Sequence, residues 1–207
     1  MLYYLSELSD GGDLFNLFRY ITFRAGGALL TALLFGFLFG RPIIGWLRRL
    51  QRRGQPIRSD GPERHLLEKQ GTPTMGGVMI LGGMLVSALL WARPDNGFVL
   101  MVLMVTLGFG LIGFADDYAK LRRYSHRGVP GKLRLAIGLA IGLAAAVWAT
   151  ALQPAGLQNA LAVPVFKDVL LNAGLLYAPF AMLVIAGSAN AVNLTDGLDG
   201  LAIMPVM

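Results

Sequence analysis

GFVLMVLMVTLGFGLIGFA, residues 97–115, is an apolar run of 19 uncharged residues that ends at two aspartates, Asp116 and Asp117. A helix needs about 20 apolar residues to cross the roughly 30 Å of hydrocarbon in a bilayer. Such a run is typical of a transmembrane helix, because a helix satisfies its backbone polar groups within the segment. The run therefore predicts an integral membrane protein rather than a soluble domain.

The rest of the chain has the composition of a membrane protein. Its 207 residues are 55% hydrophobic and 14% charged, whereas soluble domains carry about 25% charged residues. We predict an all-α fold, a polytopic transmembrane helical bundle with five complete spans and the start of a sixth, forming a single integral membrane domain over residues 1–207. The spans are expected at residues 25–47, 70–92, 97–115, 135–152, 173–192 and 201–207. Because the sixth stops after two turns, we expect the chain to be truncated.

Basic residues gather in two of the segments between these spans. Of the 18 lysines and arginines, eight lie between Arg41 and Lys69 and six between Lys120 and Arg134. Cytoplasmic loops carry an excess of Lys and Arg. We therefore expect the N-terminus to face outward and three segments to face the cytoplasm, residues 51–70, 116–134 and 193–200. The net charge of +6 then reflects topology and attraction to anionic lipid, not nucleic-acid binding.

Cysteine and histidine usage excludes several kinds of site. The chain has no cysteine and only two histidines, His65 and His126, both in basic loops. A disulfide framework and a thiolate zinc site are therefore excluded.

Small residues recur within the predicted spans, as in Gly83-x-x-x-Ser87 and Gly138-x-x-x-Gly142. Such spacing predicts faces where helices pack closely.

The first of three polar clusters lies at the start of the second predicted span, where residues 69–77 read KQGTPTMGG. Thr72 or Thr74 can cap a helix and Pro73 suits a first helical turn, so the segment can be a simple helix start. Unpaired N–H groups at a helix N-terminus, beside Lys69 and two hydroxyls, can equally bind a phosphate. Both interpretations stay open.

Asp116 and Asp117 form the second cluster, with Lys120 one turn further on. Adjacent carboxylates repel each other, and at the C-terminal end of a helix they also oppose the helix dipole. A divalent cation would stabilise them, because Mg²⁺ binds through one or two carboxylates together with substrate phosphates. The alternative is a solvated acidic end of a membrane helix, neutralised by Lys120 and the basic residues that follow.

The third cluster is GSANAVNLTDGLDG, residues 187–200. Polar side chains at membrane depth are costly, so Asn190 and Asn193 should face protein or water. Asp196 and Asp199 are three residues apart and would point to one side of a helical turn. We therefore interpret this segment as part of a functional site.

Taken together, these motifs resemble those of a known family. KQGTPTMGG, FADDYAK and GSANAVNLTDGLDGLAIMP occur in an order similar to that in bacterial phospho-N-acetylmuramoyl-pentapeptide transferases, members of the polyprenyl-phosphate N-acetylhexosamine-1-phosphate transferase superfamily. The likeness covers essentially the whole chain, as the N-terminal half of a ten-span enzyme. Related transferases share the paired aspartates, but GTPTMGG and NAVNLTDGLDGLA resemble the muramoyl branch.

The resemblance implies an Mg²⁺-dependent enzyme of the bacterial inner (cytoplasmic) membrane. It would transfer phospho-MurNAc-pentapeptide from UDP-MurNAc-pentapeptide to undecaprenyl phosphate, giving lipid I and UMP. It would thereby serve peptidoglycan synthesis, cell-wall biogenesis, cell shape and cell division. The site would lie at the cytoplasmic face, where a soluble nucleotide meets a lipid headgroup, and a homodimer is left open.

The resemblance also implies roles for single residues. Asp116 and Asp117 would be the catalytic and Mg²⁺-binding pair, with Asp116 favoured for deprotonating or orienting the lipid phosphate. Lys120 and Lys132 would contact phosphates or stabilise the pair. The other substrate-binding candidates, most of them expected to line the uridine-diphosphate site, are Lys69, Thr74, Asn190, Asn193, Asp196 and Asp199.

Two alternatives follow from the same residues. One is an enzyme that transfers GlcNAc-1-phosphate to a polyprenyl phosphate. It would differ in the exact residues of its motifs and in the sugar nucleotide that it uses as donor. The second alternative is an inactive fragment of the enzyme. Members of the family are expected to have further spans after these, with a metal-binding aspartate and a histidine-rich loop. A transporter or channel is disfavoured, because the acidic residues lie at the ends of spans rather than deep within them.

Overall fold

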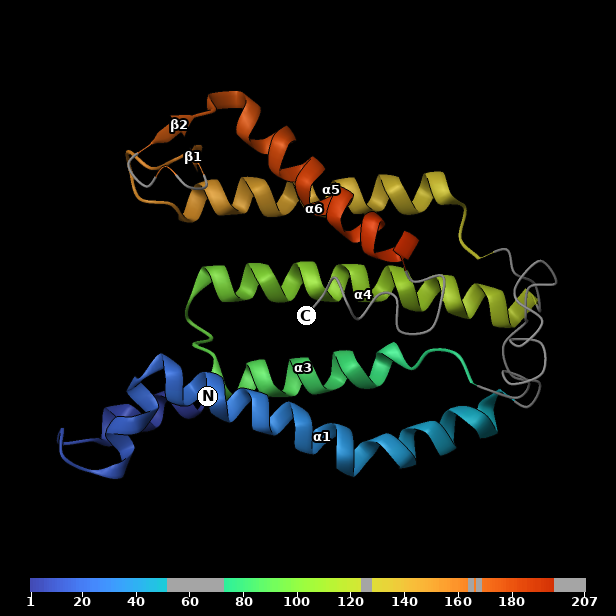
Figure 1. The fold of residues 1–207 in the computed structure, drawn as a ribbon, viewed down its shortest axis with the longest axis horizontal. Coiled ribbons are helices and arrows are strands. Elements are labelled where there is room, and N and C mark those ends of the chain that lie inside the picture. The colour runs from blue at the N-terminus through green and yellow to red at the C-terminus, as the bar shows by residue number, and fades with distance from the viewer. Residues whose placement is uncertain (52–72, 124–127, 164–165, 167–168, 196–207) are drawn as a thin grey trace. The chain divides into compact units, whose positions relative to one another are not determined.

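The computed structural model describes residues 1–51, 73–123, 128–163, 166 and 169–195 (Figure 1). Helices dominate these residues, as the apolar runs predict. The long helices are α1 (Ile21–Leu50), α3 (Gly77–Trp91), α4 (Gly97–Arg123), α5 (Gly131–Leu152) and α6 (Tyr177–Thr195). Short 3-10 helices precede α1 and α6, namely η1 (Leu2–Leu8), η2 (Leu14–Arg19) and η3 (Gly174–Leu176).

Four helical segments in the described part of the chain are long and apolar enough to cross a membrane. They are Ile21–Leu50, Gly97–Arg123, Gly131–Leu152 and Gly174–Leu194. α3 has only 15 residues, which is short of the about 20 that a span needs. The protein is therefore a helical, multi-pass membrane protein, and the described residues show four of the five predicted complete spans at spanning length. The predicted sixth, at 201–207, lies outside the described residues.

Two helix ends differ from the prediction by more than five residues. The second span was expected from residue 70, but residues 73–76 are not helical and α3 begins at Gly77. The third was expected to end at residue 115, but α4 continues through the two aspartates to Arg123. Basic side chains in its last turn, including Arg122 and Arg123, favour this extension because they complement the helix dipole.

In the part of the chain that the structure describes, one short hairpin adds strands to the predicted all-α bundle. β1 (Ala160–Ala162) and β2 (Leu170–Asn172) pair antiparallel, with Leu161 opposite Leu171. Asn159, which has a φ of 59°, accepts a hydrogen bond from the Ala173 N–H at 2.9 Å and so closes the end of the pair. The strands have three residues each, too few for an alternating pattern to reveal them in the sequence.

Contacts divide the chain into two units. The first contains residues 1–103 and 110–129, and the second contains residues 104–109 and 130–207. Each unit has its own helix packing.

In the first unit, α1 and α3 pack through small residues. The Phe35 ring lies against Gly82 and Gly83, where an added Cβ would come within 3.3 Å of it. The buried Ser87 donates to the Gly83 carbonyl at 2.7 Å, so its hydroxyl is satisfied within its own helix. The predicted packing face at Gly83-x-x-x-Ser87 is therefore confirmed.

In the second unit, glycines of α5 allow equally close approach. A Cβ at Gly142 would lie 3.0 Å from the Met182 carbonyl oxygen of α6, and one at Gly138 would lie 3.3 Å from the Phe109 ring. Gly138, Gly142, Ala145 and Ala146 are all buried. The predicted face at Gly138-x-x-x-Gly142 is thus confirmed, and it holds α6 against α5.

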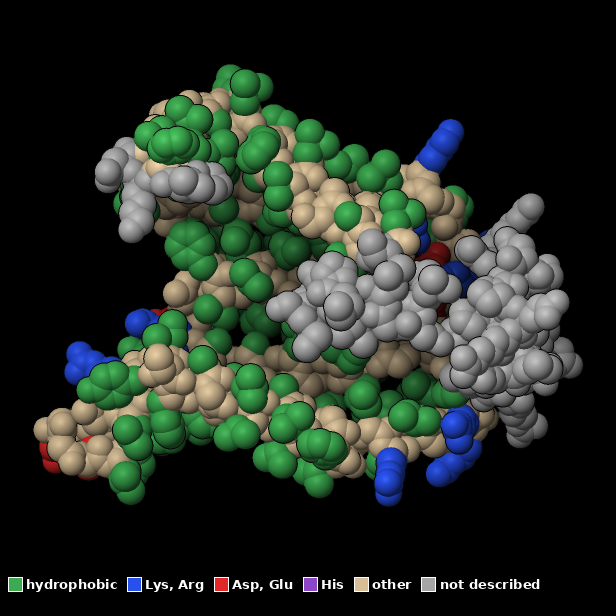
Figure 2. Space-filling view, in the orientation of Figure 1, with side chains coloured by type: hydrophobic (Ala, Val, Ile, Leu, Met, Phe, Trp, Pro, Cys, Tyr) green, Lys and Arg blue, Asp and Glu red, His purple; other side chains and the backbone are tan. Residues whose placement is uncertain are grey.

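The outer surface of α1 is strongly apolar. Phe37 is 75% exposed and Leu29 67% exposed, and Figure 2 shows hydrophobic side chains along this helix. Lipid tails offer such side chains an apolar environment that water does not. The exposed surface therefore fits a helix that spans a bilayer.

Candidate active site

Asp117 is held from two sides in the first unit. Its Oδ2 accepts a hydrogen bond from the Thr74 hydroxyl at 2.8 Å and one from the Met75 N–H at 3.3 Å. Its Oδ1 lies 3.4 Å from the Lys120 ammonium. The segment just before α3 and the last turns of α4 therefore meet at this carboxylate.

Asp116 is the more buried of the two aspartates. Its residue is 8% exposed. Its Oδ2 lies 2.6 Å from the Lys120 ammonium, and its Oδ1 accepts a hydrogen bond from the Val129 N–H at 2.8 Å. The backbone just before α5 is thereby bound to the C-terminal part of α4.

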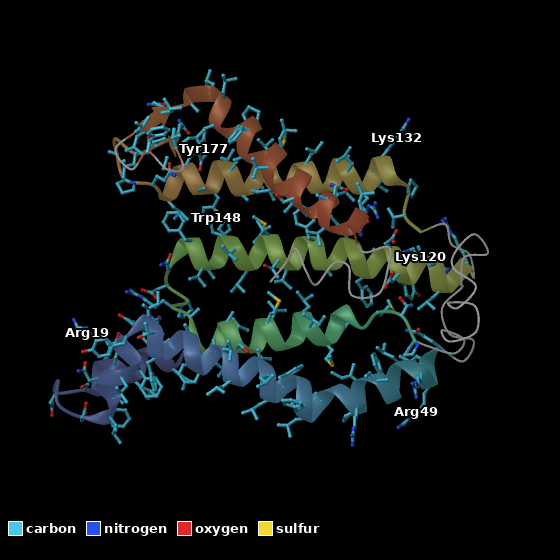
Figure 3. The ribbon with its side chains drawn as sticks, in the orientation of Figure 1. Arg19, Arg49, Lys120, Lys132, Trp148 and Tyr177 are labelled. Atoms are coloured by element: carbon cyan, nitrogen blue, oxygen red, sulfur yellow. The ribbon has the colours of Figure 1, made fainter. Side chains whose placement is uncertain are left out.

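Lys120 bridges the two carboxylates because helix geometry places it there. It follows Asp117 by three residues and Asp116 by four, and both spacings lie on one face of a helix. Figure 3 marks its position on α4. The ammonium offsets part of the repulsion between the carboxylates, which explains how α4 continues through them. These three side chains still carry one negative charge in excess, which favours a bound cation.

Gln51 is a member of the site that the sequence did not indicate. It follows the last residue of α1, and its side-chain amide binds both backbone groups of Thr74. Its Oε1 accepts from the Thr74 N–H at 2.8 Å, and its Nε2 donates to the Thr74 carbonyl at 3.1 Å. A glutamine at a helix end has no motif of its own, so only the folded arrangement reveals it.

Gly128 is the second residue that sequence reasoning missed. A Cβ at this position would lie 2.7 Å from Asp116 Cγ, closer than real Cβ atoms approach. The available signal was the Gly-Val-Pro turn before a predicted span, which reads only as a loop. The absence of a side chain here lets the Val129 N–H reach Asp116.

The predicted site residues divide into three groups. The structure brings Thr74, Asp116, Asp117 and Lys120 together in the first unit. The second unit holds Lys132, exposed and extended from the first turn of α5 (Figure 3), as well as Asn190 and Asn193. The predicted residues outside the described part of the chain are Lys69, Asp196 and Asp199.

The two asparagines of α6 have different surroundings. Asn190 donates to the Ala186 carbonyl at 2.7 Å, so its amide is bonded to its own helix. Asn193 is exposed. We expected the polar side chains of this segment to face protein or water. At Asn190 the hydrogen bond to the Ala186 carbonyl satisfies the side-chain amide within the protein.

The acidic pair is chemically suited to Mg²⁺. In the described residues no group of three or more His, Cys, Asp and Glu side chains forms a protein cage for a metal. Mg²⁺ does not require one, since it commonly binds through one or two carboxylates and completes its shell with phosphate oxygens and water. Asp117, whose side chain is 30% exposed, is more accessible than Asp116 at 12%.

Comparison with known proteins places these residues in a family. The family model of glycosyl transferase family 4 matches residues 99–207, which include the acidic pair. A signature of phospho-N-acetylmuramoyl-pentapeptide-transferases matches residues 69–81, which include Thr74. The segment that carries the signature and the segment that carries the acidic pair are thus the two segments that meet at Asp117 in the structure.

Curated relatives agree with both matches. The phospho-N-acetylmuramoyl-pentapeptide-transferase of Ruegeria pomeroyi is 69% identical over all 207 residues, and that of Dinoroseobacter shibae is 65% identical over the same length. The chain spans 57% of the length of each of these relatives. The predicted resemblance is confirmed, and the chain belongs to glycosyl transferase family 4, in which it carries the phospho-N-acetylmuramoyl-pentapeptide-transferase signature.

Proposed function

We propose that the protein transfers phospho-MurNAc-pentapeptide from UDP-MurNAc-pentapeptide to undecaprenyl phosphate in an Mg²⁺-dependent reaction that gives lipid I and UMP. The observation that carries this proposal is the direct contact between two motifs, in which Thr74 of the signature segment donates to Asp117 of the acidic pair at 2.8 Å. The names of the relatives support the same activity.

Asp117 is the proposed Mg²⁺ ligand. It is the more exposed carboxylate, and its Oδ1 is separated from Lys120 by 3.4 Å, whereas Asp116 Oδ2 lies only 2.6 Å from the same ammonium. When bound, Mg²⁺ would neutralise charge on the diphosphate and favour attack at phosphorus. Thr74 and the Met75 N–H fix the other oxygen of Asp117, so the carboxylate is preorganised.

Asp116 is proposed to orient rather than to deprotonate. A phosphate monoester has a second pKa of about 6 and is mostly dianionic at neutral pH, so the lipid phosphate needs little help to lose a proton. Asp116 is buried and bound to both Lys120 and the Val129 N–H. It therefore holds the ammonium of Lys120 at the site, where that charge can attract a phosphate.

The donor and the membrane location belong to the same proposal. The signature over residues 69–81 favours the muramoyl donor over GlcNAc-1-phosphate. The distribution of basic residues supports an outward N-terminus and a site at the cytoplasmic face of the inner membrane. A homodimer remains a proposal to be tested by the oligomeric state in detergent.

A transfer assay tests the function. A chain extended to the length of its relatives should release UMP from UDP-MurNAc-pentapeptide in the presence of undecaprenyl phosphate, lose this activity with EDTA and regain it with Mg²⁺. Preference for UDP-GlcNAc as donor would support the alternative transferase.

A further inference from the structure

We propose that Gln51 is a positioning residue that acts on Asp117 through the backbone of Thr74. This inference rests on the proposed function and adds a residue to it. Gln51 is bound to Thr74 by two hydrogen bonds of 2.8 and 3.1 Å, one in each direction. A side-chain amide that pairs with both the N–H and the carbonyl of one residue fixes that peptide segment as a neighbouring strand would.

The segment that Gln51 holds has no regular structure of its own. Residues 73–76 lie outside any helix or strand. Met75 has a φ of 69°, a left-handed conformation that residues with side chains rarely adopt. Backbone in such a conformation persists when its surroundings hold it there, and it is often found at functional sites. Gln51 on one side and Asp117 on the other supply that support.

The held segment presents two donors to Asp117. The Thr74 hydroxyl donates at 2.8 Å and the Met75 N–H at 3.3 Å, both to Oδ2. Gln51 binds the peptide groups on both sides of the Thr74 Cα, and the second of these also contains the Met75 N–H. A shift of the Thr74 backbone therefore moves both donors together. Gln51 therefore determines where Oδ2 is held and which direction Oδ1 faces.

Gln51 is itself well anchored. Its N–H donates to the Leu47 carbonyl at 2.9 Å, which continues the hydrogen bonding of α1. Its side chain therefore extends from the end of a long helix rather than from a free loop. Groups supported by a rigid element hold a site more accurately than groups on loops.

Replacing Gln51 by methionine tests the inference in the extended, active chain. Gln51→Met keeps the length of the side chain but removes both hydrogen bonds, so kcat should fall about tenfold. The KM for UDP-MurNAc-pentapeptide should change by less than about twofold, because the lost contact orients a carboxylate and does not bind the nucleotide directly.

Gln153→Met is the matched control. Gln153 also binds a backbone group, accepting from the Asn159 N–H at 3.1 Å, but it lies in the second unit beside the β1–β2 hairpin. The control loses a similar hydrogen bond and should keep its kcat. If both variants lose kcat and thermal stability in parallel, Gln51 is only structural and the inference is overturned.

Two further measurements test whether Gln51 acts through Thr74. Hydrogen exchange at the Thr74 amide should speed up in Gln51→Met and stay unchanged in Gln153→Met. In a double-mutant cycle, Gln51→Met should cost less in a Thr74→Val background than in the parent, because both changes act on one contact. Unchanged kcat, unchanged exchange or strict additivity each overturns the inference. Absence of transfer by the parent chain contradicts the proposed function instead, and the exchange measurement still decides whether Gln51 holds Thr74.

Discussion

Gly128 shows how a single missing side chain can shape an acidic site. The backbone before α5 approaches so closely that an added Cβ would lie 2.7 Å from Asp116 Cγ. The same approach delivers the Val129 N–H to Asp116 Oδ1 at 2.8 Å. The carboxylate and this backbone segment are therefore fitted to each other without room for a methyl group.

Gly128→Ala should therefore damage activity more than its size suggests. Displacing a group that positions an active site by about 1 Å can cost on the order of 10²-fold in rate, and we expect kcat of the extended chain to fall by about that factor. Gly131→Ala is the control, because a Cβ there meets nothing within 4 Å. Equal activities of the two variants would show that Asp116 tolerates the displacement.

The two aspartates themselves should each be essential. Asp116→Asn and Asp117→Asn should each lower kcat by about 10²-fold or more, since removal of one preorganised charged group typically has this effect. Asp95→Asn is a suitable comparison. Asp95 is an exposed carboxylate between α3 and α4, where a hydrogen bond from Arg93 lowers its pKa. Steady-state kinetics in nanodiscs measure all three, and near-normal turnover of either Asn variant at the acidic pair would remove that residue from the catalytic role.

At the scale of elements, α5 and α6 depend on a backbone contact. A Cβ at Gly142 would lie 3.0 Å from the Met182 carbonyl oxygen, and the backbone cannot yield as a flexible side chain can. Gly142→Ala should therefore push the helices apart and destabilise the protein by about 1–3 kcal/mol, as overpacking does in other cores. A lower midpoint of thermal unfolding in detergent is the expected readout.

Gly36→Ala provides the contrast for this prediction. Gly36 lies within α1, and a Cβ there meets nothing within 4 Å. Alanine is the better helix former by about 1 kcal/mol, so Gly36→Ala should leave the midpoint unchanged or raise it. A similar loss of stability in both variants would mean that helix propensity, and not the α5–α6 contact, dominates.

Helix ends are the elements that the sequence predicted least well. Apolar runs identified the helices correctly, because burial in lipid requires uncharged residues over a set length. The runs could not locate the first residue of α3, since Thr74 and Met75 leave the helix to bind Asp117, a partner more than 40 residues away. Nor could they show that Lys120 lets α4 continue past the aspartates.

Across the whole molecule, the sequence predicted the charged and hydroxyl side chains of the site better than the residues that hold them in place. Asp116, Asp117, Lys120 and Thr74 were predicted and lie together. Gln51 and Gly128 were not predicted, because their roles come from tertiary contacts to a backbone amide and to a carboxylate. Chemistry at a site follows from residue type, whereas support of the site follows from the fold.

The orientation in the membrane can be tested without background labelling, because the chain has no cysteine. Asn96 and Arg123 are exposed residues at opposite ends of α4. In intact cells an impermeant thiol reagent should modify Asn96→Cys and leave Arg123→Cys unmodified until the membrane is opened. The reverse pattern would show that the basic segments face outward.

The contacts around Asp116 and Asp117 also bear on how the protein is made. Their residues lie between Gln51 and Val129, and α5 begins only at Gly131. A ribosome adds about 5–20 residues per second, so these residues emerge within roughly ten seconds of one another, ahead of α5 and α6. The nascent chain can thus pair its two aspartates with Lys120, Thr74 and the backbone while synthesis continues. The carboxylates of Asp116 and Asp117 therefore need not remain unpaired at the translocon while α5 and α6 are inserted.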